Sequence, residues 1–132
     1  MRDMAFAEPD HTPRLLVVED DENARTALGD ILDLEGFEVI LSANGQEALD
    51  CLSSRPLPDL IILDLQMPVM NGWQFRREQS KNPRYARVPV IVVTAFPSVG
   101  NIEVSAVVHK PVDIQRLLTV VQELLLRVHT YH

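Results

Sequence analysis

Carboxylates stand directly after two short apolar runs of the chain. Glu19 and Asp20 follow the run 15–18, and Asp64 follows the run 60–63. Short apolar runs that end in turn signals are typical of strands buried on both faces of a parallel sheet. Ligands bind at the carboxyl ends of such strands, so we expect these acids to face a shared site.

A hydroxyl and an amine follow later runs of the same kind. Thr94 ends the run 88–94, and Lys110 comes just after the run 104–108. Carboxylates about 4 Å apart at an effective dielectric of about 20 repel by about 4 kcal/mol per pair, which a divalent cation would offset. Oxygen ligands without histidine or cysteine suit Mg²⁺, with Mn²⁺ as an alternative. Together with a lysine and a hydroxyl they suit in-line phosphoryl transfer to a carboxylate, and Asp64 is the most central candidate.

Strands and helices are expected to alternate along the whole chain. The predicted strands are 15–18, 37–41, 60–63, 88–94 and 104–108, and the clearest helices are 23–35, 72–80 and 114–128. Alternation of this kind predicts an α/β fold with a parallel sheet and helices on both faces. Right-handed crossovers then favour a flavodoxin-like, doubly wound sheet of five strands in the order 2-1-3-4-5.

Length and composition describe one ordinary globular domain. The chain has 132 residues, of which 46% are hydrophobic, and its net charge is −7. We expect a flexible leader over residues 1–13, a domain over 14–128 and a tail over 129–132. A negative net charge argues against direct nucleic-acid binding. There is no secretory signal and no apolar run of the roughly 20 residues that a membrane span needs, so we expect a cytoplasmic protein.

Five short motifs resemble the receiver domain of two-component response regulators. They are Leu-Val-Val-Glu-Asp-Asp at 16–21, Ile-Leu-Asp-Leu-Gln-Met-Pro at 62–68, Asn-Gly at 71–72, Val-Val-Thr-Ala at 92–95 and Lys-Pro at 110–111. Each motif alone is weak, but all five occur in the right order, each at the end or start of a predicted element. The resemblance covers about residues 14–128.

The resemblance implies a role for each site residue. Asp64 would accept a phosphoryl group from a histidine kinase or a histidine phosphotransfer protein, and the phosphorylated form would signal to a downstream protein. Thr94 would bond a phosphoryl oxygen, and Lys110 would pair with Asp64 and then with the phosphoryl group. Mg²⁺ would be held by Glu19, Asp20, Asp64 and the backbone carbonyl of Gln66. Such a domain assists its own phosphorylation and dephosphorylation and is not otherwise an enzyme.

Two other functions remain open from the sequence. One is a constitutive interaction module that keeps the fold and is never phosphorylated. The other is a phosphatase like the haloacid dehalogenases, which also use an aspartate at a strand end. That family expects a second aspartate two residues after the first, where this chain has Gln66. The long apolar stripe of the helix 114–128 also leaves room for a homodimer contact.

The chain departs from the family's pattern in two places. Val107 stands where the family usually has an aromatic switch residue, three positions before the lysine. Residues 96–103 alone separate the fourth and fifth predicted strands, whereas a parallel crossover usually takes roughly a dozen residues or more. Pro97 and Gly100 within this segment disfavour a helix. We therefore expect the family's fourth helix to be shortened or missing, and the usual output face to be altered.

Two side chains next to the site are expected to tune its chemistry. Gln66 and Phe96 stand two residues after Asp64 and Thr94, and we expect them to affect how fast water reaches a phosphoryl group. Trp73 and Phe75 are expected to serve mainly as helix packing.

Overall fold

The computed structural model describes residues 12–54 and 56–130, with side chains described as far as residue 127. Most of the predicted leader and the last two residues of the predicted tail lie outside the described part. Within it, none of the helices combines the length and apolar character that crossing a membrane would require.

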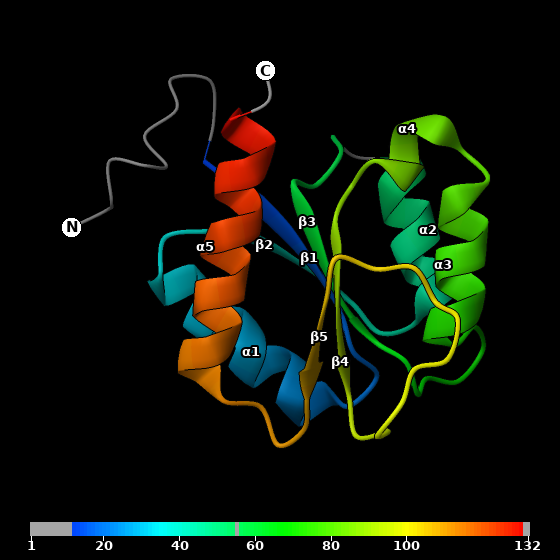
Figure 1. Cartoon of the computed structure of the whole chain (residues 1–132), viewed down its shortest axis with the longest axis horizontal. Helices are drawn as coiled ribbons and strands as arrows, with labels where there is room; N and C mark the ends of the chain where they lie inside the picture. Colours follow the sequence, from blue (N-terminus) through cyan, green and yellow to red (C-terminus); the bar gives the residue numbers. More distant parts are fainter. Residues whose placement is uncertain (1–11, 55, 131–132) are drawn as a thin grey trace.

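Five parallel strands form the central sheet, in the order β2-β1-β3-β4-β5 (Figure 1). This confirms the predicted order. The strands are β1 (Arg14–Val18), β2 (Glu38–Ser42), β3 (Leu60–Asp64), β4 (Val90–Thr94) and β5 (Ala106–His109). β1, β3 and β4 are apolar and buried almost throughout, because helices cover them on both faces.

The helices lie in two layers, one on each face of the sheet (Figure 1). One layer contains α1 (Glu22–Leu34) and α5 (Ile114–Thr130), and the other contains α2 (Gly45–Ser54), α3 (Gly72–Ser80) and the short α4 (Pro83–Ala86). Successive strand residues point to opposite faces, so each central strand contributes to two separate cores. Leu15 and Ile62 belong to the core under α1 and α5, whereas Leu16 and Leu63 belong to the core under α2 and α3.

The prediction that the helix between the last two strands is shortened or missing is confirmed. Residues 95–105, between β4 and β5, contain turns and bends but no helix, and the four-residue α4 precedes β4 instead. β5 is nevertheless paired with β4 along four residues, from Ala106 to His109. β5 begins two residues later than predicted, because the preceding chain crosses towards α3, where the Glu103 carbonyl accepts a 2.8 Å hydrogen bond from Arg76 Nε.

Candidate functional site

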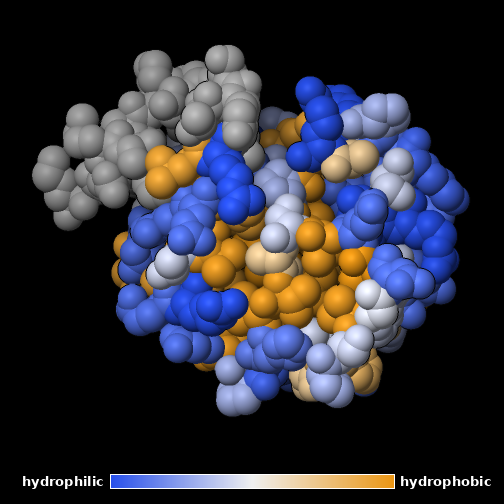
Figure 2. All heavy atoms as spheres, in the orientation of Figure 1, coloured by the Kyte–Doolittle hydropathy of each residue, from blue (hydrophilic) through white to orange (hydrophobic). Residues whose placement is uncertain are grey.

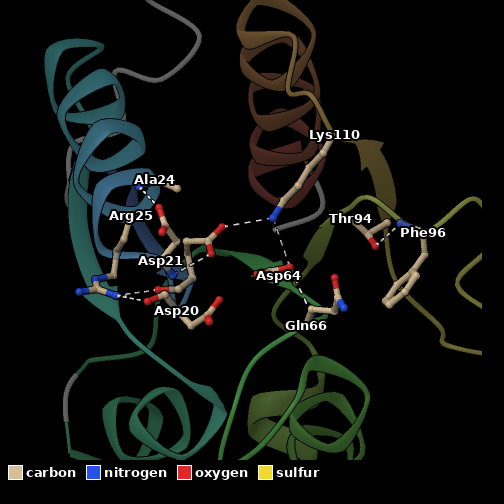
Figure 3. A network of polar contacts seen from close by, with 10 residues as sticks. Asp20, Asp21, Ala24, Arg25, Asp64, Gln66, Thr94, Phe96 and Lys110 are labelled. Atoms are coloured by element: carbon tan, nitrogen blue, oxygen red, sulfur yellow. Dashed lines mark hydrogen bonds and ion pairs between the residues drawn. The ribbon is translucent and has the colours of Figure 1, made fainter.

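Three carboxylates converge at the carboxyl end of the sheet (Figure 3). Glu19, Asp20 and Asp64 each offer an oxygen, and these oxygens lie within 4.8 Å of one another. Glu19 and Asp64 are 8% and 5% exposed, while Asp20 faces solvent. The structure therefore brings together the acids that follow β1 and β3, with one open side.

The chain after β1 is fixed by a helix cap and an arginine. Asp21 is the N-cap of α1, as its carboxylate accepts a 2.8 Å hydrogen bond from the Ala24 amide. Arg25 Nη1 donates to the backbone carbonyls of Glu19, at 2.9 Å, and Asp20, at 3.2 Å. Arg25 was not among the predicted site residues, although its place in the first turn after the cap was a usable signal. These bonds fix the backbone that carries two of the three acids.

Lys110 supplies a positive charge to two of the acids. Its Nζ lies 3.6 Å from Asp64 Oδ1 and 3.6 Å from Glu19 Oε1, so the two ion pairs share one ammonium group. Asp64 Oδ1 also accepts a 3.2 Å hydrogen bond from the Gln66 amide. The Lys110 amide donates to the Thr94 carbonyl at 2.8 Å, which ties the end of β5 to the end of β4.

Thr94 lies on the neighbouring strand and is almost completely buried, with 1% of its surface exposed. On β4 it follows Val93, the residue paired with Asp64. Its Oγ1 accepts a 3.0 Å hydrogen bond from the Phe96 amide, so the hydroxyl sits at the start of the loop 95–105. Figure 3 shows Thr94 and Phe96 on the side of Lys110 away from Asp20.

The pKa of Glu19 is changed by its burial and by the charges around it. The pKa of its carboxyl is raised from 4.5 to about 7, mainly by burial and also by the nearby charge of Asp64, although a hydrogen bond from the Asp21 amide and the charge of Lys110 lower it. The three acids therefore cannot all be ionised at neutral pH without cost. A divalent cation with a preference for oxygen ligands would remove that cost, so the donor set fits Mg²⁺.

The loop after β3 is tightly folded against Asp64. The Gly72 amide donates to the Leu65 carbonyl at 3.0 Å, and a Cβ at Gly72 would lie 2.8 Å from the Asp64 carbonyl oxygen. Within the same loop, the Met70 amide donates to the Pro68 carbonyl at 2.7 Å across Val69, whose φ is +68°. A γ-turn of this sense is rare and strained.

Two cavities reach the acidic cluster. One, of about 290 Å³, lies between α1 and α5 and is lined by Glu19, Asp64 and Lys110 together with apolar side chains. The other, of about 340 Å³, is lined by Asp20, Gln66, Trp73 and neighbouring loop residues. Gln66 and the half-buried Trp73 thus lie beside the cluster, whereas Phe75 is fully buried in the core.

Comparison with known proteins finds relatives that match this chain in sequence and in fold. A family model of the response regulator receiver domain matches residues 15–122. The polar-differentiation response regulator DivK of Brucella anthropi is 32% identical over 117 residues, which cover 84% of this chain and 94% of DivK.

Solved structures of receiver domains superpose closely on the chain. The receiver domain of a signal transduction histidine kinase from Syntrophus aciditrophicus is 30% identical with a TM-score of 0.81, covering 86% of this chain and 90% of that one. The receiver domain of the sensor histidine kinase PA1611 from Pseudomonas aeruginosa is 26% identical with a TM-score of 0.80, covering 87% and 98%; its crystal structure has a magnesium ion coordinated in the active site cleft. From this agreement in sequence and fold, the chain belongs to the receiver-domain family of two-component response regulators.

Proposed function

We propose that Asp64 is the phosphoacceptor of a two-component signalling pathway. One carboxylate oxygen of Asp64 attacks the phosphorus of a phosphohistidine. A P–O bond forms while the P–N bond breaks, and the electron pair of that bond returns to the imidazole, which takes up a proton from water. The product is an aspartyl phosphate on this chain and a free histidine on the donor.

The observation that carries this proposal is the position of Asp64 beside Lys110 and within the cluster of three acids. Lys110 Nζ lies 3.6 Å from Asp64 Oδ1, so a fixed positive charge stands beside the attacking group and its incoming phosphoryl oxygens. Thr94 lies one residue beyond the strand partner of Asp64, where its hydroxyl would bond a phosphoryl oxygen. Both neighbours would thus stabilise the negative charge that develops on the phosphoryl group.

Mg²⁺ would be held by Glu19, Asp20, Asp64 and the backbone carbonyl of Gln66. When bound, it would neutralise the negative charge that builds on the phosphoryl oxygens. The exposed Asp20 borders the cavity that also contains Gln66, which leaves an open route for a hydrated ion. Mn²⁺ prefers similar oxygen ligands, and the proposal includes it as a substitute.

The proposal implies partners on both sides of the reaction. The phosphoryl donor is a histidine kinase or a histidine phosphotransfer protein acting in the cytoplasm. The receiver of the signal is another protein rather than DNA, because the net charge of −7 disfavours contact with phosphates. The protein is a signalling switch, and its only chemistry is the gain and loss of its own phosphoryl group.

Intact-mass spectrometry tests the proposal directly. The full chain is incubated with acetyl phosphate and Mg²⁺, beside Asp64→Asn and the matched control Asp50→Asn, which changes an exposed aspartate of α2. We expect one added phosphoryl group on the wild type and on Asp50→Asn, none on Asp64→Asn, and none when EDTA replaces Mg²⁺. Absence of the added group from the wild type, with Mg²⁺ binding shown separately by calorimetry, would favour the constitutive interaction module.

A further inference from the structure

The second helical layer carries a concentration of positive charge on an acidic protein. Residues 73–87 contain five of the chain's 12 basic residues and only one acid, Glu78, in a chain of net charge −7. Glu78 is paired with Lys81 at 2.8 Å, so it offsets only one of these charges. The basic residues are Arg76, Arg77, Lys81, Arg84 and Arg87, and all of them lie on α3, on α4 or directly after them.

A groove runs between these basic residues and the loop 95–105. Its main cavity, of about 400 Å³, is lined by Trp73, Arg76, Arg77, Ser80, Asn101, Ile102 and Glu103. A second cavity of about 240 Å³ is also lined by Arg76 and Glu103 and extends to Arg87 and Pro89. Figure 1 shows the loop lying beside α3. The groove therefore lies between α3 and a segment that contains no helix.

Arg76 lines both cavities of this groove. Its Nε donates to the Glu103 carbonyl at 2.8 Å, but its Nη1 is enclosed and has no acceptor within the described part of the chain. The rest of the guanidinium group faces the groove lining, and a carboxylate is the strongest acceptor for a guanidinium group. Arg77, on the next position of α3, is exposed and lines the same cavity. Two adjacent guanidinium groups therefore favour an acidic ligand.

The groove also contains apolar side chains beside the basic ones. Trp73 and Ile102 line the main cavity, and Val99 and Val104 of the loop are partly buried against the same core. Figure 2 shows an apolar area in the middle of this face, with hydrophilic residues over α3 and α4 on its right side. A ligand that fits this mixed lining carries acidic and apolar groups together.

We propose that this groove binds an acidic segment of a partner protein that presents carboxylates to Arg76 and Arg77 and apolar side chains to Trp73 and Ile102. A nucleic acid would also supply negative charge, but the remainder of this acidic chain would repel it. Binding needs no phosphoryl group, so the inference can fail or hold independently of the role of Asp64.

Fluorescence anisotropy tests the groove on the full, unphosphorylated chain. The probe is a labelled synthetic peptide in which glutamate and aspartate alternate with leucine and phenylalanine. Its matched neutral copy carries glutamine and asparagine in place of the acids. The variants are Arg76→Gln and Arg77→Gln, and the matched control is Arg116→Gln, which changes an exposed arginine of α5. Circular dichroism of each variant checks that it is folded, and Arg77→Gln keeps the test valid if Arg76→Gln disturbs the loop.

We expect the acidic peptide to bind the wild type and Arg116→Gln equally, about tenfold more weakly to Arg76→Gln, and several-fold more weakly to Arg77→Gln. Binding should weaken as salt rises from about 0.05 to about 0.3 M, since screening shortens the range of these charges. Equal binding of the neutral peptide, or an equal loss with Arg116→Gln, would overturn the proposal. So would light scattering that shows a wild-type dimer and an Arg77→Gln monomer, because the occupant would then be a second copy.

Discussion

Asp64 and Glu19 share one ion-pair partner, the ammonium group of Lys110. Lys110 Nζ stands 3.6 Å from an oxygen of each, so the loss of either acid changes the charge that the other experiences. Only the exposed Asp20 is fully available to solvent. At the scale of single residues, the site is a set of coupled charges and not a group of independent ligands.

The raised pKa of Glu19 predicts a pH dependence of stability in the metal-free protein. Because the folded pKa is about 7 and the ordinary value is 4.5, the folded state binds more protons than the unfolded state between these values. The free energy of unfolding should therefore fall as pH rises through this window. Urea unfolding in EDTA at a series of pH values measures this fall.

Glu19→Gln tests the assignment of this pH dependence. The variant should lose most of the slope between pH values of about 5 and about 7.5, because its amide does not titrate. Glu38→Gln, which changes an acid of β2 on the outer part of the sheet, serves as control and should keep the slope. If both variants keep it, the slope does not originate at Glu19.

Val69 predicts a stabilising substitution. It is β-branched, has a φ of +68° and is 81% exposed, so it bears backbone strain without any packing in return. Val69→Asn should raise the free energy of unfolding by about 0.5–1 kcal/mol, since asparagine tolerates this conformation better. Leu34→Asn is the matched control, because Leu34 is 85% exposed within ordinary helix. Denaturant titration measures the free energy of unfolding of both variants. If Val69→Asn is no more stable relative to the wild type than Leu34→Asn is, the backbone at Val69 is not strained.

At the scale of elements, α3 holds the loop between β4 and β5 in place. Trp73 Nε1 donates to the Val99 carbonyl at 3.0 Å, and Arg76 Nε donates to the Glu103 carbonyl at 2.8 Å. The Trp73 ring also contacts Phe96, with ring centroids 5.6 Å apart. The Phe96 amide donates a hydrogen bond to the Thr94 hydroxyl, so these contacts link the end of β4 to α3. The link does not use position 107, where this chain has Val107 in place of the aromatic residue usual in the family.

This link predicts that Trp73, the chain's only tryptophan, reports the state of the site. If Thr94 turns towards a phosphoryl group, its bond to the Phe96 amide changes, and the Phe96 ring moves against the indole. We expect the fluorescence of Trp73 to change when acetyl phosphate is added with Mg²⁺.

Two variants separate this link from phosphorylation itself. Phe96→Leu should still gain the phosphoryl group by mass but show a much smaller change in fluorescence, while Asp64→Asn should show neither. A full change in Phe96→Leu would mean that the signal reaches Trp73 by the loop after β3, through the cavity that Trp73 shares with Gln66.

At the scale of the whole molecule, the sequence was sufficient to predict the features that arise from regular local patterns. The order of the five strands and the shortened or missing helix after Thr94 could be predicted, because apolar runs and Pro97 with Gly100 act locally. The arrangement of the loop 95–105 could not be predicted from the sequence. It depends on a side chain of α3 that is 26 residues distant in sequence, and such contacts leave no local pattern.

The same limit applies to the site. The acids could be predicted from their positions at strand ends, but the bonds from Arg25 to two carbonyls and the strained turn at Val69 depend on tertiary geometry. Two cores on opposite faces of one sheet bring these local features together.

The hydrogen bonds from Arg25 to the carbonyls of Glu19 and Asp20 have a consequence for the choice between cations. Calcium takes six to eight oxygen ligands, many of them from protein, whereas magnesium keeps several of its waters. Because Arg25 already engages two nearby carbonyls, few protein oxygens remain beside the three carboxylates. Magnesium should therefore displace calcium from this site in competition calorimetry. Arg25→Gln should reduce the ratio of the magnesium affinity to the calcium affinity. Equal affinities for the two cations in the wild type would contradict this prediction.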